Sequence, residues 1–123
     1  MIALNIINRL DLSIYFYFIW YINIYHMKWT SASASHILVK NKLLANTIKS
    51  NIKNYNDFKE LAKEYSVCPT YKNGGYIGYF VPGQMVSEID AAISSNTLNK
   101  SIGPIQTVFG YHLFFIHTRK LAN

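Results

Sequence analysis

The side chains that we single out as candidates for nucleophilic, basic or metal-binding chemistry are His36, Cys68 and His112. Each histidine lies within an apolar run, and the only cysteine lies in a segment rich in glycine and proline, Ser66 to Val86. A single buried histidine is usually explained by hydrogen bonds within a core. Two histidines in separate apolar runs are harder to explain in that way, and we expect them to stand side by side in one sheet.

Two generic kinds of site are open to these residues, and their spacing favours neither. A thiol hydrolase needs a thiolate, a base and an oxyanion hole. Its cysteine often lies at a helix N-terminus, whereas Pro69 and a glycine-rich loop follow Cys68. A metal site would have two histidines and one cysteine as ligands, but it lacks the close C-x-x-C or H-x-x-x-H pairing of a specific metal motif. We therefore expect no metal ligands and no cofactor.

The two histidines are expected to lie on short strands. Alternation along Ser35–Lys40 places His36 on the same face as Leu38. Along Gly110–His117, alternation places His112 among the even-numbered residues of one face. A shorter strand is expected to end at Phe80, and another to follow a connection over residues 99–104.

Helical spacing of apolar residues predicts three helices between these strands. They are expected over Lys42–Ile52, Asn54–Ser66 and Val86–Ser94. The middle helix gives the clearest pattern, because apolar residues recur at i, i+3, i+4 and i+7 from Phe58 and an asparagine can cap its start. The order strand, helix, helix, strand, helix, strand, strand predicts an α+β fold with helices covering a small antiparallel sheet.

Composition limits the class of protein. A chain of 123 residues that is 50% apolar suits one domain with one core. One cysteine cannot form an internal disulfide, which fits a reducing compartment. The net charge is +6, but the lysines are dispersed among acidic residues without a basic run. We therefore expect no nucleic-acid partner.

The first 26 residues form a separate, apolar N-terminal extension. Residues 12–27 contain no Lys, Arg, Asp or Glu, yet they are short for a membrane span of roughly 20 residues. A secretory signal cleaved at Ala32-Ser33-Ala34 would fray the strand beside His36. A third interpretation is that translation starts at Met27 and that residues 1–26 are upstream sequence. We expect this third case, with a cytoplasmic domain over 27–123, and keep a membrane anchor through residues 12–27 as the alternative.

Four segments, in order, resemble the parvulin-type peptidyl-prolyl cis-trans isomerases. They are "ASHILVK", "DFKELAKEYSVCP", "GGYIGYFVPGQMV" and "GPIQTVFGYHLFFI". The resemblance runs from about Ser33 to Arg119 and is greatest to the small stand-alone bacterial parvulins, which start close to where Met27 falls. It implies a parvulin-like four-stranded antiparallel sheet surrounded by helices, with a shallow site over the sheet.

The resemblance also implies roles for individual residues. His36 and His112 match two central histidines that hydrogen-bond to each other, and Cys68 matches a position held by Cys or Asp. Thr107 matches a threonine in the hydrogen-bonded group around the histidines. The residues that match the apolar pocket for the proline ring and its wall are Met85, Ile89, Phe80 and Ile77.

The implied activity is non-covalent rotation of X-Pro bonds in unfolded or flexible polypeptides, by a monomer that needs no membrane unless residues 1–26 are an anchor. Two departures keep open a non-catalytic, polypeptide-binding chaperone: Tyr76 replaces an acidic residue, and Ile89 replaces an aromatic one. Lys40 and Lys42 stand without the arginine of the phosphate-selective branch. We therefore expect no preference for phosphoserine, because bidentate phosphate capture favours arginine.

Overall fold

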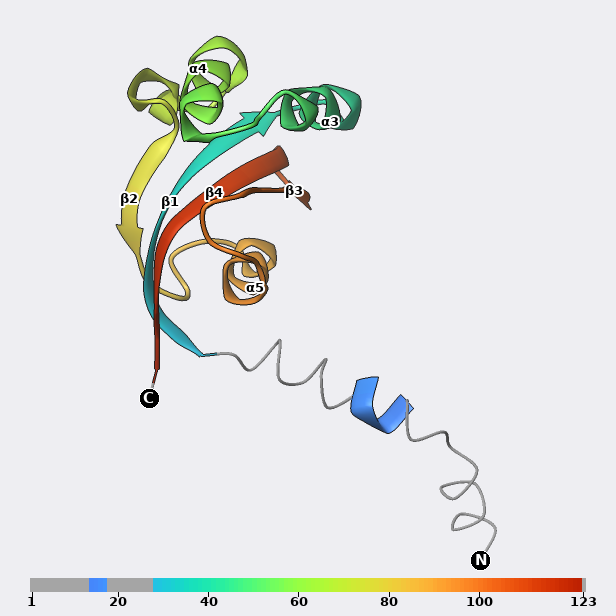
Figure 1. Ribbon diagram of the computed structural model, residues 1–123, viewed down its shortest axis with the longest axis vertical. Coiled ribbons are helices and arrows are strands. Elements are labelled where there is room, and N and C mark those ends of the chain that lie inside the picture. Colours follow the sequence, from blue (N-terminus) through green and yellow to red (C-terminus); the bar gives the residue numbers. More distant parts are fainter. Residues whose placement is uncertain (1–13, 18–27, 123) are drawn as a thin grey trace, which may run out of the picture.

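The computed structural model of the chain describes residues 14–17 and 28–122 (Figure 1). Residues 14–17 form a short helical stretch with exposed side chains. The expected boundary at residue 26, the start at Met27 and most of the proposed anchor lie outside the described residues. No helix in the described ranges is long and apolar enough to cross a membrane.

A four-stranded antiparallel sheet, in the order β2-β1-β4-β3, forms the centre of the domain. The strands are β1 (Trp29–Val39), β2 (Tyr76–Phe80), β3 (Ser101–Thr107) and β4 (Gly110–Leu121). The two long strands β1 and β4 run side by side through the middle and curve together (Figure 1). The first and last strands of the domain therefore build its central pair.

Three α-helices cover the sheet: α3 (Lys42–Ser50), α4 (Tyr55–Tyr65) and α5 (Ser87–Ser95). Asparagine side chains cap the first two. Asn41 accepts from the backbone N–H of Leu44 at 3.0 Å, and Asn54 accepts from that of Asp57 at 2.9 Å. A 3-10 helix, η1 (Pro69–Asn73), links α4 to β2. The predicted order of strands and α-helices is confirmed.

Alternation along β4 divides the core into two clusters, one on each face of the sheet. Leu113 and Phe115 pack with residues of α3 and α4, including Ile48 and Phe58. Phe114 and Ile116 pack on the other face with residues of α5. We call these the helix-pair face and the α5 face. The histidines at positions 36 and 112 share the side of the sheet on which Phe114 lies.

The strand boundaries differ from those expected. β1 begins at Trp29 rather than Ser35, because small residues such as Ala32 and Ala34 are buried in the α5-face cluster and pair with both neighbouring strands. β3 begins at Ser101, inside the expected connection, with an irregularity between Ile102 and Ile105. β4 continues to residue 121, and α3 ends two residues earlier than expected.

Candidate active site

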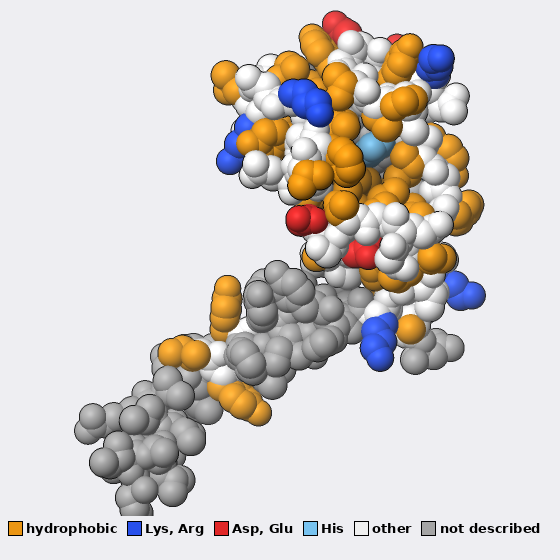
Figure 2. Space-filling model, turned by 180° about the vertical axis from the view of Figure 1, so that it is seen from behind, with side chains coloured by type: hydrophobic (Ala, Val, Ile, Leu, Met, Phe, Trp, Pro, Cys, Tyr) orange, Lys and Arg blue, Asp and Glu red, His pale blue; other side chains and the backbone are white. Residues whose placement is uncertain are grey.

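A groove of about 450 Å³ opens on the α5 face of the sheet. Its lining residues are His36, Leu38, Cys68, Gln84, Met85, Val86, Ile89, Phe109, His112 and Phe114. In Figure 2, a histidine surface is visible in a hollow surrounded by hydrophobic side chains. Residues from five separate segments meet here, and the central strands form the floor.

The floor carries three neighbouring rings. The ring centroids of His36 and His112 lie 5.7 Å apart, with 23° between their planes. Phe114 lies within 6 Å of both, at 5.5 Å from His36 and 5.9 Å from His112. Both histidines are buried. The prediction that they stand side by side is confirmed by this geometry.

The hydrogen bond implied between the two histidines is absent from the described residues. His112 Nε2 instead lies 2.7 Å from the Thr107 hydroxyl, which also accepts from the Phe109 backbone N–H at 3.1 Å. Both ring nitrogens of His36 and Nδ1 of His112 are buried without a hydrogen-bond partner in the described structure. The two rings are instead stacked, with 23° between their planes.

Burial keeps both histidines neutral at physiological pH. Desolvation, followed by the charge of His112, lowers the pKa of His36 from 6.5 to about 4. Desolvation, followed by the charge of Lys40, also lowers the pKa of His112. The floor is therefore an uncharged surface with unsatisfied ring nitrogens.

Cys68 lies beside His36 because the segment after α4 is hydrogen-bonded to β1. The Val67 N–H donates to the Leu38 carbonyl at 2.8 Å, and the Leu38 N–H donates to the Ser66 hydroxyl at 3.1 Å. Cys68 is half-buried as a free thiol. No hydrogen bond joins its sulfur to either histidine in the part of the chain described.

One glycine permits this close approach. Gly75 has φ +87°, and its carbonyl accepts from the His36 N–H at 2.9 Å. A Cβ at this position would lie 2.4 Å from the His36 carbonyl oxygen. A larger residue would therefore push the loop that carries Cys68 away from β1.

The loop before α5 presents Met85 to the groove. Its path is held by Asp90, which accepts from the Gly83 N–H at 2.8 Å, and by Gln84, which accepts from the Val81 N–H at 2.7 Å. Met85 is partly buried against the α5-face cluster that contains Ile89. The two residues predicted for the proline pocket therefore both line the groove.

Three predicted site residues do not line the groove. Phe80 is buried within the α5-face cluster, with its ring edge-on to Trp29 at 5.6 Å, and Ile77 packs against the same cluster. Thr107 is buried behind His112. These residues contact the groove residues or their core cluster without lining the groove.

Five lining residues were not predicted as site residues: Leu38, Gln84, Val86, Phe109 and Phe114. The period-2 pattern already places Leu38 and Phe114 on the histidine face, so this signal was present in the sequence. Phe109 lies in the β3–β4 turn with 54% of its surface exposed. No pattern in the sequence marks Phe109, because its exposure beside Val108, itself 90% exposed, is a property of the folded structure.

The groove can bind an apolar ring without covalent chemistry. Its walls are mainly hydrophobic, its histidines are neutral, and no cluster of three His, Cys, Asp or Glu suited to a metal occurs among the described residues. The available chemistry is therefore apolar contact together with hydrogen bonding from the thiol and the imidazoles.

Comparison with known proteins gives a consistent result. Residues 31–118 match a family model described as a rotamase, PPIC-type PPIASE domain. The chain is 42% identical over 81 residues to foldase protein PrsA of Geobacillus kaustophilus, a match that covers 65% of this chain and 29% of that protein. The chain thus spans less than a third of that relative.

Solved structures extend the similarity to the fold. The crystal structure of the peptidylprolyl isomerase PrsA from Bacillus anthracis superimposes with a TM-score of 0.72 at 30% identity, covering 82% of this chain and 48% of that one. The solution structure of NmPin, the parvulin of Nitrosopumilus maritimus, gives a TM-score of 0.58 at 31% identity. That match covers 72% of this chain and 97% of NmPin.

Proposed function

This chain belongs to the PPIC-type peptidyl-prolyl isomerase family, and we propose that its groove accelerates cis-trans rotation of X-Pro bonds in unfolded or flexible polypeptides. The observation that carries the proposal is a groove that is lined by both Met85 and Ile89 and has a neutral histidine pair as its floor. Relatives named foldases agree with a role in protein folding.

The reaction needs no bond cleavage. Rotation about a peptide bond faces a barrier of about 18–20 kcal/mol, because amide resonance is lost when the bond twists. Uncatalysed exchange of X-Pro bonds takes roughly tens to hundreds of seconds, which is slow enough to limit folding. A site that binds the twisted form better than either planar form accelerates the exchange.

The groove residues suit this differential binding. Met85, which packs against the cluster that contains the buried Ile89, offers an apolar surface to the proline ring. We infer that the carbonyl before the proline lies over the histidines and Cys68, in surroundings that are poor in water and without net charge. Such surroundings favour the twisted amide, in which resonance and charge separation are reduced.

Substrate preference follows from the charges near the groove. The Lys40 ammonium group donates to the Phe109 carbonyl, and Lys42 is exposed at the start of α3. No arginine lines the groove. We therefore propose that phosphorylation before the proline is not required, since lysine lacks the bidentate fork of arginine.

A non-catalytic polypeptide-binding module is the second candidate. Ile89 stands where the family has an aromatic residue, and only 5% of its surface is exposed. The pocket for the proline ring therefore gains no stacking from this position, and an apolar groove without ring stacking could hold a peptide without accelerating rotation.

A refolding assay separates the two candidates. The full chain at micromolar concentration should accelerate the proline-limited refolding phase of an unfolded substrate protein, and Cys68→Asp should retain appreciable activity. Absence of acceleration, with intact binding of proline peptides, would support the binding module. Complete loss of activity in a folded Cys68→Ser variant, with a trappable acyl-enzyme in the parent protein, would indicate nucleophilic chemistry instead.

We also propose that the protein acts in the cytoplasm as a monomer, without nucleic acid. The single cysteine and the dispersed lysines support this, and both core clusters are completed within one chain. Fractionation of the native cell, with intact-mass measurement, tests the location. A full-length species released from membranes only by detergent would favour anchoring through residues 12–27.

A further inference from the structure

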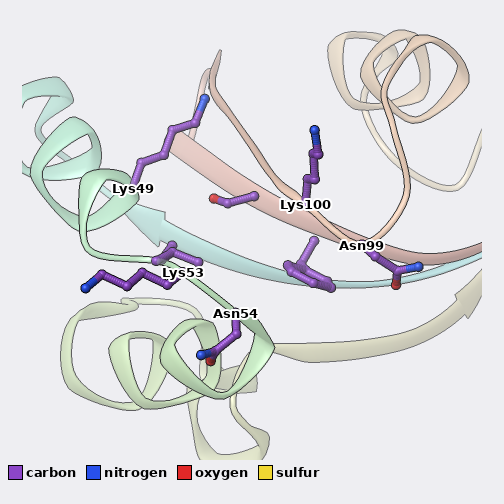
Figure 3. A pocket seen from close by; sticks show the side chains of 8 residues that line it. Lys49, Lys53, Asn54, Asn99 and Lys100 are labelled. Atoms are coloured by element: carbon purple, nitrogen blue, oxygen red, sulfur yellow. The ribbon is translucent and has the colours of Figure 1, made fainter.

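A second pocket, of about 270 Å³, lies on the helix-pair face of the sheet (Figure 3). Its lining residues are Lys49, Ile52, Lys53, Asn54, Asn99, Lys100, Ser101 and Phe115. Phe115 points to this face whereas its neighbour Phe114 points into the groove. The second pocket is therefore separated from the isomerase groove by the sheet itself.

The charge of this pocket is entirely positive. Three of its lining residues are lysines and none is acidic. The ion pair between Lys63 and Glu60 is the one recorded in the described part of the chain, so Lys49, Lys53 and Lys100 have no carboxylate partner there. The nearest acid along the chain, Asp57, accepts instead from the Lys53 backbone N–H at 3.0 Å.

Two of the lysines are placed to act together. In Figure 3, Lys49 and Lys100 come from opposite sides of the opening and extend in the same direction, whereas Lys53 points outward. The Lys49 ammonium group donates to the Gly103 carbonyl, which anchors this side chain. An ammonium group has three donors, so two remain for a ligand.

Neutral donors complete the pocket. The Ser101 hydroxyl is buried and has no hydrogen-bond partner in the described structure. Asn54 caps the N-terminus of α4 at the pocket wall, and Asp57 in the first turn already offsets the positive end of that helix dipole. An unsatisfied buried hydroxyl is costly, and rotation of the Ser101 side chain toward the pocket would let a ligand oxygen relieve that cost.

We propose that this pocket binds a compact phosphate-class anion. Within the described residues, lysine charges without a carboxylate partner and a hydroxyl without a hydrogen-bond partner match a tetrahedral, multiply charged oxyanion better than a monovalent carboxylate. Lysine binds phosphate as a point charge, and the apolar surfaces of Ile52 and Phe115 strengthen its attraction by excluding water. Binding here is independent of the isomerase groove.

The test is a titration of the full chain, labelled with ¹⁵N, with inorganic phosphate and with pyrophosphate. Sodium acetate at matched ionic strength serves as the carboxylate control. We expect saturable shifts of the Asn54, Asn99 and Ser101 amides with the phosphates and no saturation with acetate. Saturation with acetate at equal affinity, or no saturable shift with either phosphate, would overturn the proposal.

Variants separate a formed site from general attraction by the net charge. Lys49→Gln/Lys100→Gln should abolish saturation, and the single variant Lys100→Gln should weaken binding about two- to fivefold. The matched control Lys72→Gln/Lys120→Gln removes the same charge from exposed positions outside the pocket and should bind normally. An equal loss of phosphate binding in the control would show that the effect comes from the net charge alone and would contradict the proposal.

The uncharged variant Ser101→Ala gives the sharpest result. Loss of one hydrogen bond to a charged ligand should weaken phosphate binding about tenfold. Isomerase activity should stay unchanged in all of these variants, because none of the substituted residues lines the groove. Unchanged phosphate affinity in folded Ser101→Ala would contradict the role of the buried hydroxyl.

Discussion

The histidines on the two faces of the sheet differ in how many of their ring nitrogens are hydrogen-bonded. On the helix-pair face, His117 Nε2 lies 2.9 Å from the Ser35 hydroxyl, which in turn lies 3.0 Å from the Tyr55 hydroxyl. The Tyr55 ring meets His117 edge-on at 4.6 Å. On the α5 face, His36 and His112 stack over an open groove, and three of their four ring nitrogens have no partner in the described structure.

This difference distinguishes a histidine with a structural role from two histidines that belong to the candidate site. An unsatisfied buried polar group costs about 1–3 kcal/mol, and native proteins pair the great majority of such groups. The helix-pair face follows that rule around His117. The α5 face departs from it beside a groove of about 450 Å³, where a bound polypeptide can supply the missing partners.

The largest expected loss of stability comes from a substitution on the helix-pair face. Phe58 is fully buried between α4 and the sheet, and Phe58→Ala should lower the free energy of unfolding by about 3–5 kcal/mol. Urea denaturation measures this loss. Activity per folded molecule should remain at the wild-type value, and a folded variant without activity would break the division between the two faces.

The next largest loss of stability depends on pH and comes from His36 on the α5 face. The pKa of His36 is about 4 in the folded protein and about 6.5 when unfolded. Between these values the unfolded chain binds more protons, so stability is complete above pH 6.5 and is lost as the pH falls toward 4. His36 alone should account for a loss on the order of 2 kcal/mol by pH 4.5.

Urea denaturation at pH 7.5 and pH 4.5 measures this loss, with His36→Gln as the comparison. The variant should lose less stability on acidification than the parent protein. A residual loss is expected, because burial also lowers the pKa values of His112 and His117. An identical acid response in both proteins would show that His36 is not buried in its neutral form.

A smaller loss of stability is expected from His112→Ala, together with a loss of activity. The substitution leaves the buried Thr107 hydroxyl without its 2.7 Å partner and removes one ring of the stack. The free energy of unfolding should fall by about 1–3 kcal/mol. Peptide isomerisation assays on the folded variant give the second readout, and a wild-type rate would remove His112 from the site.

His117→Ala is the matched substitution on the opposite face and the smallest expected change. Ser35 keeps its hydrogen bond to Tyr55, so the loss should be about 1 kcal/mol. Isomerase activity should be unchanged. If His117→Ala lowered the rate as much as His112→Ala, the contrast between the faces would have no functional meaning.

The sequence predicted the face on which each histidine lies, because a period of two along β1 and β4 leaves little choice. It did not predict how the rings meet. Ring orientation depends on side-chain torsions and on Phe114, which packs against both histidines. The implied hydrogen bond between them was therefore wrong, although their proximity was right.

The start of β1 and the burial of Phe80 were not predicted correctly, because the local sequence pattern is weak at both places. The start of β1 is rich in alanine and serine, and its burial comes from β2, β4 and the α5-face cluster rather than from its own hydrophobicity. Phe80 was predicted at the wall of the groove but is buried in the α5-face cluster and does not line the groove. Pairing of β1 with β2 shifts register between Ala34 and Ser35, and Gly78 has φ +82°, so simple alternation fails along this edge strand.

The most direct test is exchange spectroscopy on a peptide with a single X-Pro bond, with catalytic amounts of the full chain or of Met85→Ala. The parent protein should raise the cis-trans exchange rate, and Met85→Ala should lower kcat/KM about tenfold through lost apolar contact while the free energy of unfolding changes little. The matched His117→Ala protein should behave as the parent. Equal exchange rates with and without the parent protein, or undiminished catalysis by folded Met85→Ala, would contradict the assignment of the groove as the isomerase site.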